Sequence, residues 1–518
     1  MEVQAAATRP SREDTFMTSL LRRVAVVLAI AVCLPLGGAA FASPGNGIGS
    51  PGIGDPYYPD YGNGGYDVAH YAIHVGYTPA TDQLTGDTTI TAHATQRLAR
   101  FDLDLMLTAS EVTVNGAPAR FRQRPHELVV RPRHVLAAGQ KMVVRVRYAG
   151  VPSTVADGDI RPWIKTADGA LAINEPEIAA WWYPADDHPR DKATFDVHVR
   201  VADGLEALSN GNLVSSRVRD GQRTWHWRET SPMATYLAFF DVGQFDITRT
   251  RSHGIPVITA VASNGGQEGT YAAADLARTP EIVDFESSLW GPYPFKQMGG
   301  IAPAADFGFA LENQTRPNYS RKFWRNGPNV YVAVHELAHQ WYGDSVSVHS
   351  WKDIWLNEGF ATFTEWMWSQ RHGEGSAASL FRATWDQHPA DDTFWRQRIG
   401  NPGAGEEFDD PVYDRGAMTL QALRTRVGNR TFLRIMRSWA REHRYANGRI
   451  SQFVALAERV SGKRLDRFFR VWLFTAHRPA PTVANGFPPH FGTSRYPTPI
   501  SLAKIMDVQR VAQQTERR

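Results

Sequence analysis

The residues best suited to chemistry lie in one short apolar run, Val332 to Asp344, which contains the pattern His-Glu-x-x-His. Apolar residues around the pattern indicate a helix that is buried in a core. Residues four positions apart lie on one face of a helix, so His335 and His339 can present two imidazole nitrogens to one metal ion. Glu336 follows the first histidine and can reach a water molecule on that metal. The run predicts two ligands and the general base of one zinc site per chain.

A catalytic zinc site takes three protein ligands and leaves one position open for water. The segment WLNEGFA offers the third ligand, Glu358, with eighteen residues between it and His339. This interval leaves room for the first helix to end near Gly343-Asp344 and for a second helix to begin near Asp353. We therefore expect Glu358 to come from that second helix.

Glu365 lies seven residues, about two helical turns, beyond Glu358, so the two carboxylates share a helix face. We expect Glu365 to hold a ligand histidine in its tautomer. The alternative is that His335 and His339 merely lie on a helix surface without a metal. The apolar surroundings of both segments argue against it, because buried carboxylates and imidazoles need partners.

The pairing of HELAHQW with the glutamate of WLNEGFA resembles the aminopeptidase N and leukotriene hydrolase family of zinc metallopeptidases. The resemblance implies a multidomain fold, with an N-terminal antiparallel, saddle-like β domain. A thermolysin-like α+β catalytic domain would follow, mostly helical after the zinc motif. It also implies a short secreted bacterial type without the large C-terminal helical domain of many members.

A second motif, Phe309 to Asn313, resembles the Gly-x-Met-Glu-Asn strand of the family, which is an exopeptidase signature. Phe309 replaces the usual glycine and Leu311 the usual methionine. The resemblance implies that Glu312 and Asn313 bind substrate. A carboxylate beside zinc can bind the ammonium of a free N-terminus by a charge-assisted hydrogen bond and so select chain ends. Without the motif, a Glu-Asn pair would equally fit a surface turn.

Two more roles come from the resemblance alone. Glu175 corresponds to a family glutamate that reaches from the β domain to the substrate's α-amino group, although Ile173 replaces the usual glutamine. Tyr413 corresponds to a phenol that stabilises the oxyanion, with Arg415 in place of the usual lysine. Outside this context, Tyr413 would be a packing residue before a helix, and the polar stretch 186–192 would fit a solvated loop.

The composition is that of an ordinary globular protein, because the 518 residues are 42% hydrophobic and 21% charged. A net charge of +3 is too small to predict nucleic-acid binding. We expect a flexible Gly/Pro-rich leader at 43–63 and a β domain at 64–245, where Asn-Gly and Asp-Gly turns separate strand patterns. A catalytic domain at 246–480 and a Pro-rich tail at 481–518 complete the prediction.

The first 42 residues have the pattern of a signal peptide, for which Met17 is a possible true start. A twin arginine precedes the apolar run Val24–Leu36, and Ala40–Ala42 provides a small-x-small cleavage site. The apolar run is shorter than the roughly 20 residues that a membrane span needs, so we expect no transmembrane segment in the mature chain. Cys33, the only cysteine, lies in this segment. We therefore expect a product without disulfides that is secreted or stays at the cell envelope.

Together these patterns predict an aminopeptidase that hydrolyses the N-terminal residue from peptides with a free N-terminus. Zinc-bound water would attack the peptide bond, with Glu336 as general base and Tyr413 as oxyanion donor. Two alternatives stay open. A zinc endopeptidase or another hydrolase on the same site would accept N-acetylated peptides equally well. A non-enzymatic binding protein on this fold would bind no zinc.

Overall fold

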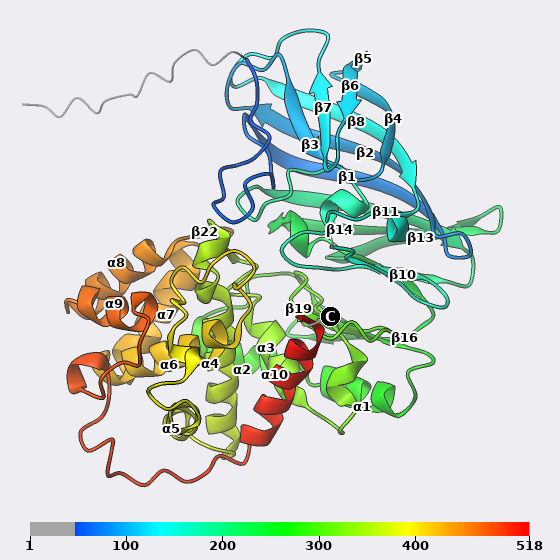
Figure 1. The fold of residues 1–518 in the computed structure, drawn as a ribbon. Helices are drawn as coiled ribbons and strands as arrows, with labels where there is room; N and C mark the ends of the chain where they lie inside the picture. Colours follow the sequence, from blue (N-terminus) through cyan, green and yellow to red (C-terminus); the bar gives the residue numbers. More distant parts are fainter. Residues whose placement is uncertain (1–46, 159, 517–518) are drawn as a thin grey trace, which may run out of the picture. The chain divides into compact units, whose positions relative to one another are not determined.

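A computed structural model describes residues 47–158 and 160–516, with side chains described as far as residue 511. The expected signal peptide lies outside these residues. Within them a β-rich domain precedes a mostly helical one, which confirms the predicted fold class (Figure 1). Among the described residues, no helix combines the length and the apolar character needed to cross a bilayer.

The β domain is built on an eight-stranded sheet in which all neighbours are antiparallel except β1 and β11. Side chains of β1 alternate between buried and more exposed positions, so one sheet face packs in the core and the other faces solvent. In sheet order the strands are β13 (Asn212–Arg219), β14 (Gln222–Ala234), β11 (Lys192–Ala202), β1 (Tyr66–Thr78), β2 (Gln83–Ala94), β8 (Lys141–Gly150), β4 (Thr108–Val114) and β5 (Ala117–Pro118).

Two smaller sheets complete this domain. One contains β12 (Glu206–Leu208), β15 (Phe240–Gly243), β10 (Ala170–Ala172) and β9 (Trp163–Lys165). The other contains β3 (Phe101–Asp104), β7 (Glu127–Arg131) and β6 (Arg120–Gln123).

The second domain opens with a five-stranded sheet of β16 (Phe245–Ser252), β17 (Ile255–Ala262), β18 (Met298–Ala302), β20 (Asn318–Tyr319) and β19 (Ala310–Leu311). A short parallel pair joins β21 (Val346–Val348) to β22 (Ala446–Gly448). The helices are α1 (Gly266–Leu276), α2 (Thr279–Trp290), α3 (Val330–Ala338), α4 (Trp355–His372), α5 (Ala377–Gln387), α6 (Asp410–Val427), α7 (Asn429–Glu442), α8 (Ile450–Ser461), α9 (Asp466–Phe474) and α10 (Leu502–Glu516).

Helix α3 ends earlier than the sequence predicts, at Ala338 rather than near Gly343-Asp344. Beyond it, several backbone hydrogen bonds span five residues instead of four. The N–H of Asp344, for example, donates to the carbonyl of His339 at 2.9 Å. His339 is the C-cap residue, but its φ of −60° and ψ of −23° are still helical. The face shared with His335 is therefore preserved. Helix α4 begins at Trp355, two residues from the expected start near Asp353.

Helices α4 and α6 cross at two glycines. A Cβ on Gly359 would lie 2.9 Å from the Cα of Gly416, and a Cβ on Gly416 would lie 2.7 Å from the Cα of Gly359. Only glycine permits so close an approach of the two backbones. Glu358 directly precedes one glycine, and Tyr413 lies one helical turn before the other. The crossing therefore fixes the separation of these two side chains.

The expectation of a flexible leader at 43–63 is wrong for its described part, residues 47–63. The buried carboxylate of Asp55 accepts hydrogen bonds from the N–H of Trp351 at 3.0 Å and from the ring of His188 at 3.2 Å. The N–H of Asn63 donates to Asp186 at 2.6 Å. Asp186 and its neighbours are buried as well, so the alternative of a solvated loop there is also wrong. The polar groups of residues 47–63 and those of the loop at 186–192 therefore form hydrogen bonds with one another.

The C-terminal stretch, expected as a Pro-rich polar tail, also packs on the catalytic domain. After the prolines it forms helix α10, drawn in red in Figure 1, which packs against α3. The amide of Asn329, the N-cap of α3, donates to the carbonyl of Lys504 at 3.0 Å. Val508 is nearly buried. The segment is polar overall, but it forms a weakly amphipathic helix that buries this side chain.

Replacing Asp55 with alanine should lower the free energy of unfolding by about 2–3 kcal/mol, because the buried N–H of Trp351 would lose its acceptor. Denaturant midpoints measure this loss. The control, Asp60→Ala, changes an exposed residue of the same stretch and should stay within about 0.5 kcal/mol of wild type. Equal midpoints for both variants would show that Asp55 does not fasten the leader.

Candidate active site

The three predicted ligands come together in the structure. The Nε2 atoms of His335 and His339 lie 3.4 and 3.5 Å from Oε2 of Glu358, and all three residues are buried. Ligands that lie 2.0–2.2 Å from a tetrahedral zinc ion are about 3.3–3.6 Å apart. The observed spacings therefore fit one zinc ion between the three atoms.

The distal nitrogens of both imidazoles are held by other groups. Nδ1 of His335 lies 2.6 Å from Oε1 of Glu365, and Nδ1 of His339 lies 3.0 Å from the carbonyl oxygen of Tyr342. Both partners accept a hydrogen bond from Nδ1–H, which leaves the Nε2 lone pairs for the metal. Glu365 thus occupies the place predicted for it, and the donor set suits zinc.

Glu336 is buried beside the two histidines and borders the same cavity. Burial raises its pKa to about 8, while the neighbouring histidines act in the opposite direction. A carboxylate whose pKa lies near neutrality can take a proton and return it in one catalytic cycle.

Glu312 and Glu175 reach this cavity from two different domains. Oε1 of Glu312 accepts a hydrogen bond from the hydroxyl of Tyr236 at 2.7 Å. Oε1 of Glu175 is shielded from solvent and has no hydrogen-bond partner within the described structure. Burial raises the pKa of both carboxyl groups, and the charge of Glu312 raises that of Glu175 further. Both are placed to receive a cation.

Tyr413 lies in the first turn of α6 and borders the cavity, with its ring centroid 6.0 Å from that of His335. Arg415 points elsewhere. Its guanidinium donates to backbone carbonyls, including those of Gln397 and Thr475, each at 2.8 Å. The change from the usual lysine therefore affects packing around α6 and leaves the cavity wall unaltered.

Comparisons with known proteins agree with this geometry. The profile of the Peptidase M1 N-terminal domain matches residues 68–237, and that of the Peptidase family M1 domain matches residues 284–472. The chain belongs to the M1 family of zinc metallopeptidases.

Among its M1 relatives is Aminopeptidase M1 of Arabidopsis thaliana, 27% identical over 58% of this chain and 36% of the relative. The M1 zinc metallopeptidase of Deinococcus radiodurans is 28% identical and superposes with a TM-score of 0.73 over 83% of this chain and 99% of that structure. A mutant of the Deinococcus enzyme was solved bound to a Tyr-Ser-Ala substrate, with 27% identity and a TM-score of 0.73 over 83% and 100% of the two chains. The chain spans less than half the length of the curated relatives that it matches.

Asn313 is the one predicted site residue of this M1 chain that does not border the cavity. Its amide donates to the carbonyl of Leu237 at 3.0 Å, and its Oδ1 accepts from the amide of Asn318 at 3.0 Å. Both polar ends are thus engaged inside the protein. Asn313 thus braces the segment that carries Glu312, and its expected substrate-binding role stays a prediction.

The cavity has a volume of about 310 Å³ and includes apolar walls that the M1 motifs do not reveal. Phe309, at the usual glycine position, forms part of the wall, as does Leu311. The residues that sequence analysis missed come from segments distant in the chain. They are Asn174, Phe323, Thr362, Phe408, Asp410, Val508 and Gln509, together with Tyr236 behind Glu312. The amide of Gln509 donates a 2.7 Å hydrogen bond to Asp414. No local sequence pattern predicts this contact.

Changing Glu365 to glutamine should weaken zinc binding by about 10- to 100-fold, because the amide holds the His335 tautomer less firmly. Competition with a chelator measures this affinity. Glu358→Gln removes a ligand itself and should weaken binding more. Asp386→Asn, an exposed change on α5, is the control and should leave the affinity unchanged. Wild-type affinity in Glu365→Gln would contradict the assigned role.

Proposed function

We propose that this chain is a zinc aminopeptidase that removes the N-terminal residue from peptides. The observation that carries the proposal is the charge of the cavity. Five glutamates border it, namely Glu175, Glu312, Glu336, Glu358 and Glu365. No lysine or arginine of the described residues borders it with them. Buried carboxylates need counter-charges, so the cavity suits a metal dication together with a substrate that brings its own cation.

The free N-terminus of a peptide is such a cation. Glu312 and Glu175 would bind the ammonium by charge-assisted hydrogen bonds, while Tyr236 keeps Glu312 in place. Anchoring that end positions the first peptide bond at the metal ligands, because the anchors and the ligands share one small cavity. An internal peptide bond has no ammonium nearby to pair with the two glutamates.

When bound, zinc supplies an acidified water molecule and polarises the carbonyl of the scissile bond. Glu336 would take the proton of the attacking water and return it to the leaving amine. The hydroxyl of Tyr413 would donate to the oxyanion, a contribution of about 3–4 kcal/mol for one well-placed donor. Glu365 would act only by orienting His335.

Two relatives support this assignment. The Arabidopsis protein is named an aminopeptidase, and the Deinococcus structure holds a tripeptide with a tyrosine at its start. The apolar walls formed by Phe309, Phe323 and Phe408 suit an apolar side chain on the first residue. An endopeptidase would leave the two anchor glutamates without a cation, and a non-enzymatic binding protein would have no need of Glu336.

The test compares aminoacyl-anilides with their N-acetylated forms. We expect cleavage of the free-amine substrates only. Glu336→Gln should abolish cleavage, and Tyr413→Phe should lower kcat by about 10²- to 10³-fold. Glu312→Ala should sharply raise KM, whereas the control Glu111→Ala, on the exposed surface of β4, should change nothing. Equal cleavage of acetylated substrates would overturn the amine anchor and favour an endopeptidase.

We further propose that the chain is exported and that its signal peptide is removed before Ser43, as the small residues Ala40 and Ala42 suggest. Expression in a bacterial host with an intact export system should release a product that begins at Ser43. N-terminal sequencing of that product checks the site. Replacing Ala40 and Ala42 with bulky residues should block processing, and an unprocessed wild-type chain inside the cells would refute export.

A further inference from the structure

A second group of metal-binding residue types lies in the β domain. Asp104 ends β3, His126 lies in the turn after β6, and Glu127 begins β7. One ligand atom from each lies within 4.8 Å of the others, and all three residues are buried. None of them borders the catalytic cavity.

Four buried side-chain atoms of this group make no hydrogen bond in the described structure, although two of them form a 3.4 Å ion pair with each other. They are Oδ1 of Asp104, Nδ1 of His126 and both carboxylate oxygens of Glu127. Leaving such atoms unpaired in a core is costly. Nδ1 of His126 lies 3.4 Å from Oδ1 of Asp104, the same separation as between His335 and Glu358. Two ligands on one tetrahedral zinc ion have about this spacing.

The other nitrogen of His126 is held as it is in the catalytic site. Its Nε2 lies 2.8 Å from Oε2 of Glu177, just as Nδ1 of His335 lies 2.6 Å from Glu365. A carboxylate on the distal nitrogen is the usual support for a metal-ligating imidazole. The ring of Tyr61 stacks on His126 with centroids 5.3 Å apart and covers one side of the group.

Negative charge exceeds positive charge around this imidazole. Asp104 lies at its Nδ1 and Glu177 at its Nε2, and Glu127 and Asp157 each offer an oxygen within 4.8 Å of a ring nitrogen. A protonated His126 would offset only one of these four carboxylates. A dication bound between Asp104, His126 and Glu127 would offset two more and give each unpaired atom a partner.

We propose that Asp104, His126 and Glu127 bind a second, structural Zn²⁺. Asp104 Oδ1, His126 Nδ1 and one oxygen of Glu127 supply three ligand atoms, and a water molecule would complete the tetrahedron. The ion would fasten β3 to the turn between β6 and β7. Through His126 and Glu177 it would also hold the segment that carries Glu175.

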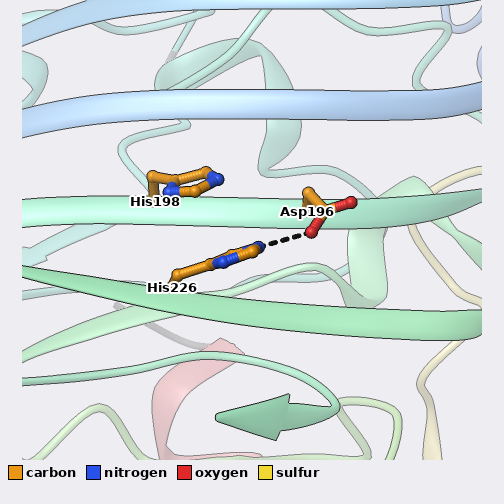
Figure 2. A group of neighbouring side chains, drawn as sticks. All are labelled: Asp196, His198 and His226. Carbon is orange, nitrogen blue, oxygen red and sulfur yellow. Dashed lines mark hydrogen bonds and ion pairs between the residues drawn. The ribbon is translucent and has the colours of Figure 1, made fainter. Parts of the chain in front are cut away.

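A third group, Asp196, His198 and His226 on the solvent-facing side of the eight-stranded sheet, serves as a control (Figure 2). There His226 already bonds to Asp196, which also accepts from Arg228 at 2.7 Å. The ring of His198 stacks on that of His226 with an interplanar angle of 15°, and all three residues are only half-buried. Surface histidines can still take up zinc adventitiously, and a variant here measures that background.

The experiment counts zinc by elemental analysis after exhaustive dialysis of the full chain. We expect about two ions per wild-type chain, about one in Glu127→Gln or Glu358→Gln, and none in the double variant. His198→Gln should keep both. Thermal unfolding gives a second readout. Glu127→Gln should unfold at a lower temperature than wild type when zinc is loaded, and at an equal or higher temperature after chelation.

Three results would overturn the proposal. One zinc per wild-type chain would leave no second site. Loss of the second ion in His198→Gln would place it on the sheet surface. A Glu127→Gln variant that is more stable than wild type in zinc would mean that Glu127 is simply a strained buried carboxylate.

Discussion

The arrangement of this protein depends on burying carboxylates where no side-chain cation can neutralise them. The catalytic cavity holds five glutamates and two imidazoles, and no lysine or arginine of the described chain borders it. Such a site is stable only with ions that come from outside. Glu336 and Glu358 require the metal, whereas Glu175 and Glu312 are best satisfied by the ammonium of a substrate. The same imbalance thus accounts for the cofactor and for the proposed preference for chain ends.

Backbone geometry turns this charge pattern into a site. Helix α3 carries His335 and Glu336, and its irregular end leaves His339 helical while freeing the carbonyl of Tyr342 to hold that imidazole. The contact between α4 and α6 at Gly359 and Gly416 then brings Glu358 and Tyr413 to one cavity. Larger residues at either glycine would separate the helices and move both side chains at once.

The zinc site was predictable because its spacing is local: His335 and His339 share one helical face, and Glu358 and Glu365 share another. Glu175 and Tyr413 needed the family resemblance, since their partners are distant in sequence. The internal hydrogen bonds of Asn313 were not predictable, because a motif does not show which way an amide points. The place of Val508 in the cavity wall was not predicted, because α10 is a polar helix with one buried stripe. The packing of residues 47–63 was not predicted, because the hydrogen-bond partners of Asp55 are His188 and Trp351, which lie far along the chain.

The catalytic cavity and the group around His126 are linked by three consecutive residues, Glu175 to Glu177. Glu175 borders the catalytic cavity, and Glu177 holds His126 in the β domain. The amide of Asn174, just before Glu175, donates to the carbonyl of Glu177 at 2.9 Å and closes the turn. An anchor that must keep a buried, unpaired carboxylate pointing at a substrate needs such rigid support, because repulsion from Glu312 would otherwise push it away. Glu177, two residues from Glu175, is held by His126, and the proposed metal ion on His126 would add to that support from the β domain.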